Sequence, residues 1–144
     1  MTDTYDDGTA VRREVLGDAH VDRAIAATTE FTHDFQEFIT RYAWGSVWTR
    51  PGLDRPTRSV VTLTALLAHG HWEEFAMHVR AALRNGLTAG EIAEVILHAG
   101  VYCGVSAANR AFAIAREVLE DDEVDLPDMP DMPDMDDAHP GDRT

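Results

Sequence analysis

The chain has 144 residues, 44% of them hydrophobic, which is enough to bury the core of one domain and excludes disorder throughout. Its formal net charge of −14 at pH 7 argues against nucleic-acid binding, because that function needs a basic surface. The charge is unevenly distributed: residues 120–143 hold eleven acidic residues and one arginine, so the rest of the chain is only mildly negative.

The sequence also indicates a compartment. No run of apolar residues approaches the roughly 20 that a membrane-spanning helix needs. The first residues, Met1 to Asp7, are acidic where a secretory signal would be basic and then apolar. The single cysteine, Cys103, cannot form an internal disulfide. We therefore expect a cytoplasmic protein that does not enter the membrane.

Helical patterns begin early in the chain. Residues 1–17 are predicted to form an N-terminal arm, and one helical domain is expected to span residues 18–120. A short helix is predicted over residues 22–29. The next helix carries aromatic residues four, three and four positions apart, which places them in one stripe. These residues are Phe31, Phe35, Phe38 and Tyr42.

Two helices joined by a tight turn are predicted next. Asp54 can cap the first of them, whose initial turn tolerates Pro56, and Gly70 ends it. The second is expected over residues 72–84, because Asn85-Gly86 is a typical C-terminal stop. Its apolar residues recur every four positions and are expected to face inward. They are Phe75, Val79 and Leu83.

The last two helices are rich in alanine. Thr88 and Glu91 form a capping box for the first, which Gly104 ends, and Ser106 is expected to cap the second. The alanines favour close helix contacts, either within the chain or between subunits. No stretch alternates with period two, so no sheet is expected and the fold class is predicted to be all-α.

A separate tail is predicted over residues 121–144. It repeats Pro-Asp-Met three times between Pro127 and Met135 and contains no aromatic residue. Such a composition cannot offset the entropy cost of ordering the chain, so we expect a disordered tail. A solubilising role fits it better than a regulatory one.

The most informative polar residues are His71, Glu74 and His78. Their spacing of i, i+3 and i+7 predicts that all three project from one helix face. A carboxylate four residues before an imidazole can hydrogen-bond it and raise its pKa, as a proton-transfer group at neutral pH requires. A solvated surface pair would show the same spacing. A metal site is a third interpretation, but the spacing is not HExxH, and no metal is expected.

Other polar and aromatic residues have two interpretations each. Arg58, one turn into its helix, can bind a substrate carboxylate through two N–H groups or lie solvated on the surface. His98 and Tyr102, one turn apart, can line a pocket or be core residues with satisfied hydrogen bonds. Trp44 and Trp48 can form a pocket wall or pack at a helix end.

Five segments between Leu53 and Leu119 follow one another at a recognisable spacing. They are Leu53-Asp-Arg-Pro-Thr-Arg-Ser-Val-Val-Thr-Leu63, Glu74 with His78-Val-Arg-Ala-Ala-Leu-Arg-Asn-Gly86, Thr88 to Glu91, Ile96-Leu-His-Ala-Gly-Val-Tyr102 and Ala107-Ala-Asn-Arg-Ala-Phe112. The run from Leu53 to Leu119 that contains them is about half of the chain and resembles the carboxymuconolactone decarboxylase family. The resemblance implies the all-helical alkyl hydroperoxidase D-like fold, assembled as a homotrimer or homohexamer.

The same fold includes peroxidases that carry a Cys-x-x-Cys-x-x-x-His run. If His78 matches that histidine, the two cysteine positions fall at His71 and Glu74, and neither is a cysteine. Disulfide exchange needs one thiolate to attack and a second to resolve. Cys103 lies elsewhere and is interpreted as a small buried residue. The resemblance therefore favours the decarboxylase branch.

That branch implies decarboxylation of 4-carboxymuconolactone to the enol lactone of 3-oxoadipate, in the β-ketoadipate pathway of aromatic catabolism. We expect no cofactor, because the conjugated lactone accepts the electrons itself. Glu74 and His78 are the candidate catalytic residues, and Arg58, His71, His98 and Tyr102 are candidates for binding the anionic substrate. The alternatives are another small lactone or keto acid as substrate, or a non-catalytic helical oligomer.

Overall fold

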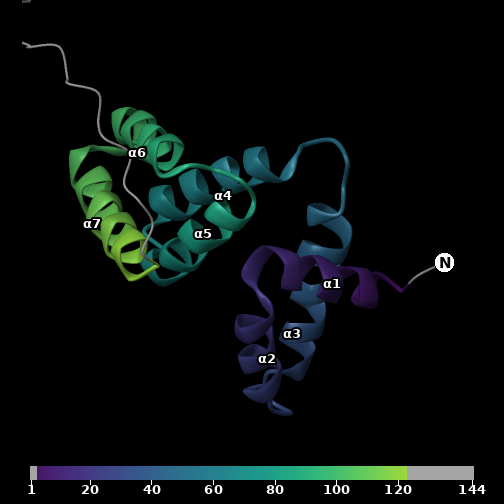
Figure 1. Cartoon of the computed structure of the whole chain (residues 1–144). Coiled ribbons are helices and arrows are strands. Elements are labelled where there is room, and N and C mark those ends of the chain that lie inside the picture. The colour runs from purple at the N-terminus through teal and green to yellow at the C-terminus, as the bar shows by residue number, and fades with distance from the viewer. Residues whose placement is uncertain (1–2, 123–144) are drawn as a thin grey trace, which may run out of the picture.

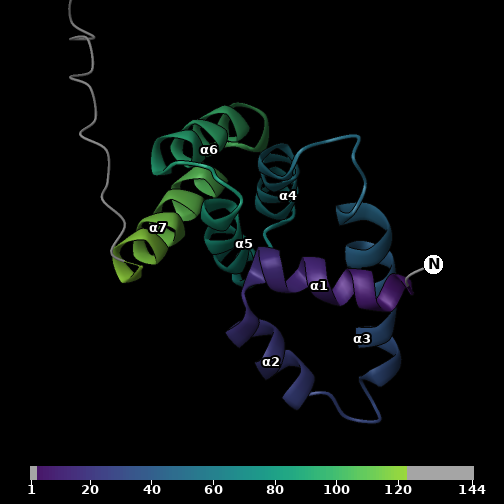
Figure 2. The same ribbon diagram turned by 45° about the vertical axis from the view of Figure 1, so that its right-hand side comes forward.

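The computed structural model describes residues 3–122, and this part of the chain is helical with no strand, as predicted. The elements, in chain order, are α1 (Thr4–Leu16), α2 (Asp18–Ala26), α3 (His33–Ile39), the π-helix η1 (Thr40–Trp48), α4 (Arg55–His69), α5 (Trp72–Arg84), α6 (Ala89–Cys103) and α7 (Val105–Asp121). Figures 1 and 2 show two groups: α4 to α7 form a bundle, and α1, α2 and α3 lie to one side of it.

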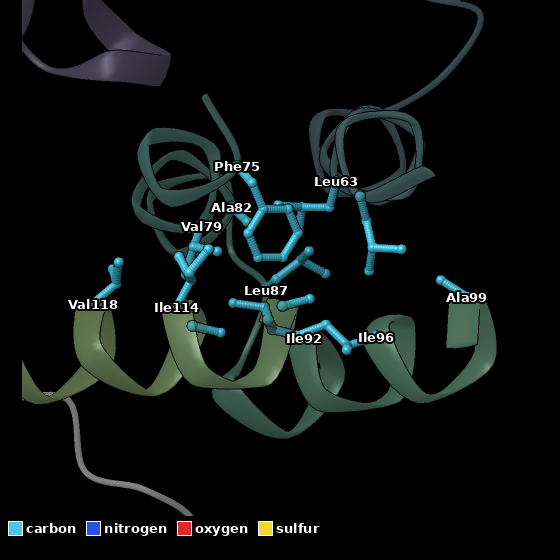
Figure 3. Packing of buried hydrophobic residues seen from close by; sticks show 13 residues of the cluster. Leu63, Phe75, Val79, Ala82, Leu87, Ile92, Ile96, Ala99, Ile114 and Val118 are labelled. Carbon is cyan, nitrogen blue, oxygen red and sulfur yellow. The ribbon is translucent and has the colours of Figure 1, made fainter. Parts of the chain in front are cut away.

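The four-helix bundle holds the larger hydrophobic core. Phe75 and Val79 of α5 are fully buried there, which confirms that they face inward, and Leu83 is half-buried against the same cluster. Figure 3 shows Phe75 and Val79 directed toward Ile92 and other apolar residues of the neighbouring elements. Burying side chains of this size contributes about 1.5–3 kcal/mol each, so these contacts stabilise the bundle.

A second, smaller core joins α5 to the N-terminal helices. It consists of Val15, Leu16, Val21, Trp44 and Ala81. Ala81 and Ala82 are consecutive and both fully buried, but Ala82 belongs to the first core. The α5 helix therefore packs against both groups of helices, and it carries His78 between them.

Several predicted helix ends are confirmed. The Asp54 carboxylate accepts a hydrogen bond from the Thr57 N–H at 2.8 Å. Gly70 ends α4 in the left-handed conformation, with φ of 67°. Thr88 and Glu91 form the reciprocal capping box. The N-terminal caps at Asp54 and Thr88 contribute about 1 kcal/mol each, because they satisfy N–H groups that the helix leaves unpaired.

Two predicted boundaries were wrong. The last helix begins at Val105, directly after Gly104, so Ser106 lies in its first turn and provides no cap. Gly104 turns the chain from α6 into α7 with φ of 99°, which leaves no room for a connecting loop. The short helix predicted over residues 22–29 is α2, which spans Asp18–Ala26.

The N-terminal residues belong to the fold. Residues 1–17 were expected to be an arm, but Thr4–Leu16 form α1, which crosses η1 where Gly8 and Gly45 meet. A Cβ at either glycine would overlap a backbone oxygen of the opposing helix, so only glycine permits this close crossing. Val15 and Leu16 fix the end of α1 in the smaller core. The tail was predicted over residues 121–144; α7 includes Asp121, and residues 123–144 lie outside the described residues.

Candidate active site

His78 lies at the junction of the two helix groups. Its residue is only 8% exposed. The imidazole packs against Trp44 and Trp48 of η1, with ring centroids 6.4 Å from each and interplanar angles of 7° and 21°. The two indoles stack on one another at 5.2 Å. Both tryptophans therefore pack at a helix end with His78 as the third ring, and Trp48 also lines a pocket, so both interpretations apply to it.

The environment of His78 differs from the prediction. Glu74 is exposed and does not hydrogen-bond the ring, whose Nδ1 is buried without a partner in the described chain. The pKa of His78 is lowered to about 4: burial is the main cause, the charge of His20 also lowers the pKa, and Glu74 partly opposes both. Glu74 does raise the pKa of His78 as expected, but the expected hydrogen bond is absent and desolvation outweighs the effect of the carboxylate. At pH 7 the folded protein holds a neutral imidazole here.

His71 does not share this site. It is the N-cap residue of α5, exposed, and makes no capping hydrogen bond through its side chain. Its ring packs against that of His69, with centroids 5.7 Å apart. Because His71 precedes the first helical turn, the expected common face with Glu74 and His78 does not form.

A pocket of about 510 Å³ is lined by Trp48. It is enclosed by α1, the end of η1 and the loop that leads to α4, and its cationic lining residues are Arg50 and Arg55. Arg55 pairs with Glu14 at 2.6 Å. Arg50 forms no ion pair with any residue between 3 and 122. We call this the loop pocket.

Arg58 lies behind the loop pocket and is half-buried. Its Nη2 donates a hydrogen bond to the carbonyl oxygen of Arg50 at 3.0 Å, which anchors the loop. Its Nε is buried and has no acceptor among the described residues. The sequence singled out Arg58 but missed Arg50, since a lone arginine in a loop carries no periodic signal. Only the fold shows that Arg50, in the loop between η1 and α4, lines the same pocket as Trp48.

His98 and Tyr102 are brought together elsewhere. Their rings lie 5.7 Å apart on α6 and line a pocket of about 480 Å³ between α4 and α6. This pocket shares no lining residue with the loop pocket. Cys103 lines it too and is half-buried, not fully buried as expected. The predicted site residues are thus not brought together: His71 packs against His69, and His98 and Tyr102 lie on α6, apart from His78 and Arg58.

Between residues 3 and 122, no three His, Cys, Asp or Glu side chains are grouped closely enough to hold a metal ion. No helix in that range has the length and apolar character needed to cross a membrane.

Comparison with known proteins relates these features to a family. The sequence model of the Carboxymuconolactone decarboxylase family matches residues 33–117. A 4-carboxymuconolactone decarboxylase of Acinetobacter baylyi is 50% identical over 117 residues, which are 81% of this chain and 87% of that protein. The nitrosuccinic acid decarboxylase npaB of Metarhizium robertsii is 44% identical over 117 residues, 81% of this chain and 82% of its own.

Proposed function

Because the chain belongs to the carboxymuconolactone decarboxylase family, we propose that it decarboxylates 4-carboxymuconolactone to the enol lactone of 3-oxoadipate. The observation that carries this proposal is the 50% identity to the Acinetobacter baylyi enzyme over 87% of that enzyme's length. The reaction would belong to the breakdown of protocatechuate through the β-ketoadipate pathway. We place the protein in the cytoplasm, because its single cysteine cannot form an internal disulfide of the kind typical of secreted proteins.

The proposed reaction needs little from the protein beyond binding and proton transfer. The bond between the ring carbon and its carboxylate breaks, and its electron pair moves through the conjugated ring to the lactone carbonyl oxygen. Carbon dioxide leaves and a dienolate remains, which a proton then traps at carbon. The substrate is its own electron sink, so the protein must stabilise an oxyanion, supply one proton and hold the second carboxylate.

His78 is the residue that we assign to proton transfer. In the free protein its imidazole is neutral, since its pKa is about 4. A dianionic substrate beside the ring favours the imidazolium, because opposite charges stabilise one another strongly where water is excluded. His78 would then take up a proton as the substrate binds and deliver it to carbon. Glu74 assists through its charge, which raises the pKa of His78.

The loop pocket is where we place the substrate. Trp48 lines it directly and packs against His78 with ring centroids 6.4 Å apart, so a flat lactone can contact the indole within reach of the imidazole. Arg50 has no acidic partner among the described residues and can bind a carboxylate. Arg58 holds the Arg50 backbone and contributes its own positive charge. His71, His98 and Tyr102 lie outside this arrangement, so the proposal does not depend on them.

Self-association is the second part of the proposal, as a homotrimer or homohexamer. The predicted aromatic stripe is exposed in the single chain, with Phe31 at 96% and Phe35, Phe38 and Tyr42 each above half. A second exposed apolar group, including Val101 and Val105, lies where α6 meets α7. Exposed apolar surface of this extent is typical of protein contacts. Other copies of the chain would cover it.

The decisive experiment is incubation with freshly generated 4-carboxymuconolactone while carbon dioxide release is measured. We expect turnover that is lost in the His78→Asn variant. Nitrosuccinic acid should be assayed in parallel, because a relative 44% identical to this chain is named for its decarboxylation. A larger kcat/KM for nitrosuccinic acid would replace the proposed substrate. No release from either compound would favour another lactone or keto acid, or a non-catalytic oligomer.

A further inference from the structure

Arg12 of α1 is a buried arginine without an acidic partner. It is 8% exposed, and no carboxylate lies within ion-pair distance of it among residues 3–122. Burial alone lowers the pKa of its guanidinium, and no nearby acid opposes this effect apart from the Tyr5 phenol. Proteins normally bury a guanidinium only against a carboxylate or phosphate, since an unpaired buried charge is destabilising.

The hydrogen bonds of Arg12 are long and few. Its Nη1 and Nη2 both donate to Oε1 of Gln36 at 3.4 Å, and Nη1 also lies 3.5 Å from the Thr40 hydroxyl. These distances exceed the usual 2.7–3.2 Å. The Nε–H is buried and has no acceptor in the described chain. Two N–H groups of the guanidinium fork thus converge on one neutral oxygen, where a carboxylate would offer two charged ones.

The fork lines a cavity. A pocket of about 360 Å³ lies between α1, α2 and α3, and its lining includes Arg12, Tyr5, Thr28, Gln36 and Arg41. The charge of Arg41 is neutralised by ion pairs with Asp3 and Glu37. Arg12 is therefore the arginine of this pocket that has no carboxylate partner among the described residues, while Ile25 supplies an apolar wall.

We propose that this pocket is a binding site for a small organic monocarboxylate, held by the fork of Arg12. The buried fork offers two N–H groups to one carboxylate, and the volume and Ile25 suit a short carbon chain. The site is distinct from the loop pocket, because the two share no lining residue. They also lie on different faces of α1: Tyr5 and Arg12 are seven residues apart on one face, while Asp7 and Val11 line the other pocket.

The site may be tested without knowing its natural ligand, using butyrate as the probe. Thermal unfolding and calorimetric titration of the full chain would compare sodium butyrate with butyramide, its neutral analogue, and with sodium chloride at equal ionic strength. We expect butyrate alone to bind saturably and raise the unfolding temperature. A wild-type protein that responds equally to butyrate, butyramide and chloride would overturn the proposal.

Three variants test which pocket binds butyrate. Arg12→Met keeps the length of the side chain without its charge, and should weaken butyrate binding at least about tenfold. Arg23→Gln removes an exposed charge of α2 outside the pocket and should keep the response. Arg50→Gln should also keep it. A response lost in Arg50→Gln but retained in Arg12→Met would place butyrate in the loop pocket and refute the inference, while supporting the proposed substrate site.

Stability separates a binding role from a structural one. Without butyrate, Arg12→Met should unfold at a temperature no lower than wild type, since it removes a buried charge that has no partner. A purely structural arginine would give a clearly lower temperature and no butyrate response in either protein. If the variant does not fold, the site can be tested in the wild-type protein by recording the NMR signals of the arginine Nε–H groups with and without butyrate. The Arg12 signal must then shift with butyrate, and its failure to shift would refute the site.

Discussion

The buried imidazole of His78 should make the protein less stable in mild acid. Its folded pKa of about 4 lies below the usual 6.5 of an unfolded histidine. Between these values the unfolded chain binds a proton that the folded chain does not, so stability falls as the pH drops through this window. The loss of stability due to His78 is nearly complete at pH 4 and changes little below that pH. Its full size is about 3 kcal/mol, and about 2 kcal/mol is reached by pH 5.

The His78→Gln variant isolates this contribution. We would measure the free energy of unfolding by urea at pH 7 and pH 5 for both proteins, at one fixed protein concentration because an oligomer responds to dilution. Other titrating groups act in both proteins, so the loss between the two pH values should be about 2 kcal/mol smaller in the variant. Equal losses would mean that folded His78 takes up a proton as readily as an exposed histidine, and the reasoning would fail.

Four further outcomes are expected. His78→Asn should lower kcat about 10²–10⁴-fold, whereas Glu74→Gln, which removes only an exposed charge, should cost less than tenfold in steady-state assays. Arg50→Gln should mainly raise KM if the lost contact is equal in ground and transition states, and a fall confined to kcat would contradict this role. Light scattering should find an oligomer that Phe38→Glu weakens, and a monodisperse wild-type monomer would refute self-association. Cys103→Ser and dialysis against a chelator should each leave carbon dioxide release intact, and its loss in folded protein would revive a thiol or metal mechanism.

The sequence predicted the fold well where local signals agree with tertiary packing. Asp54, Gly70 and the Thr88 capping box mark helix ends through short-range hydrogen bonds, and all three are observed. The prediction that Ser106 caps the last helix was wrong. The backbone conformation of Gly104 allows α7 to begin at Val105, and capping preferences do not predict this. The helix α1 was missed because its anchor is the crossing at Gly8 and Gly45, and a single glycine in a polar segment gives no periodic signal.

The candidate site was harder to predict for a physical reason. Spacing identified Glu74 and His78 as neighbours on α5, but it could not show that one is exposed and the other buried. Burial is decided by Trp44 and Trp48, which come from a different element, and it reverses the direction of the pKa shift. Likewise, the loop pocket exists only because α1 and the end of η1 face the same loop.

The position of α5 between two cores has a consequence for folding cooperativity. Ala81 packs with the N-terminal helices and Ala82 with the bundle, so one turn of helix belongs to both. Neither group can open without exposing apolar surface of α5, and the two should therefore lose structure together. The integrity of the site then depends on residues that never approach the substrate. A weakened contact deep in the bundle reduces the fraction of molecules with an assembled His78 cluster as surely as a change beside the ring.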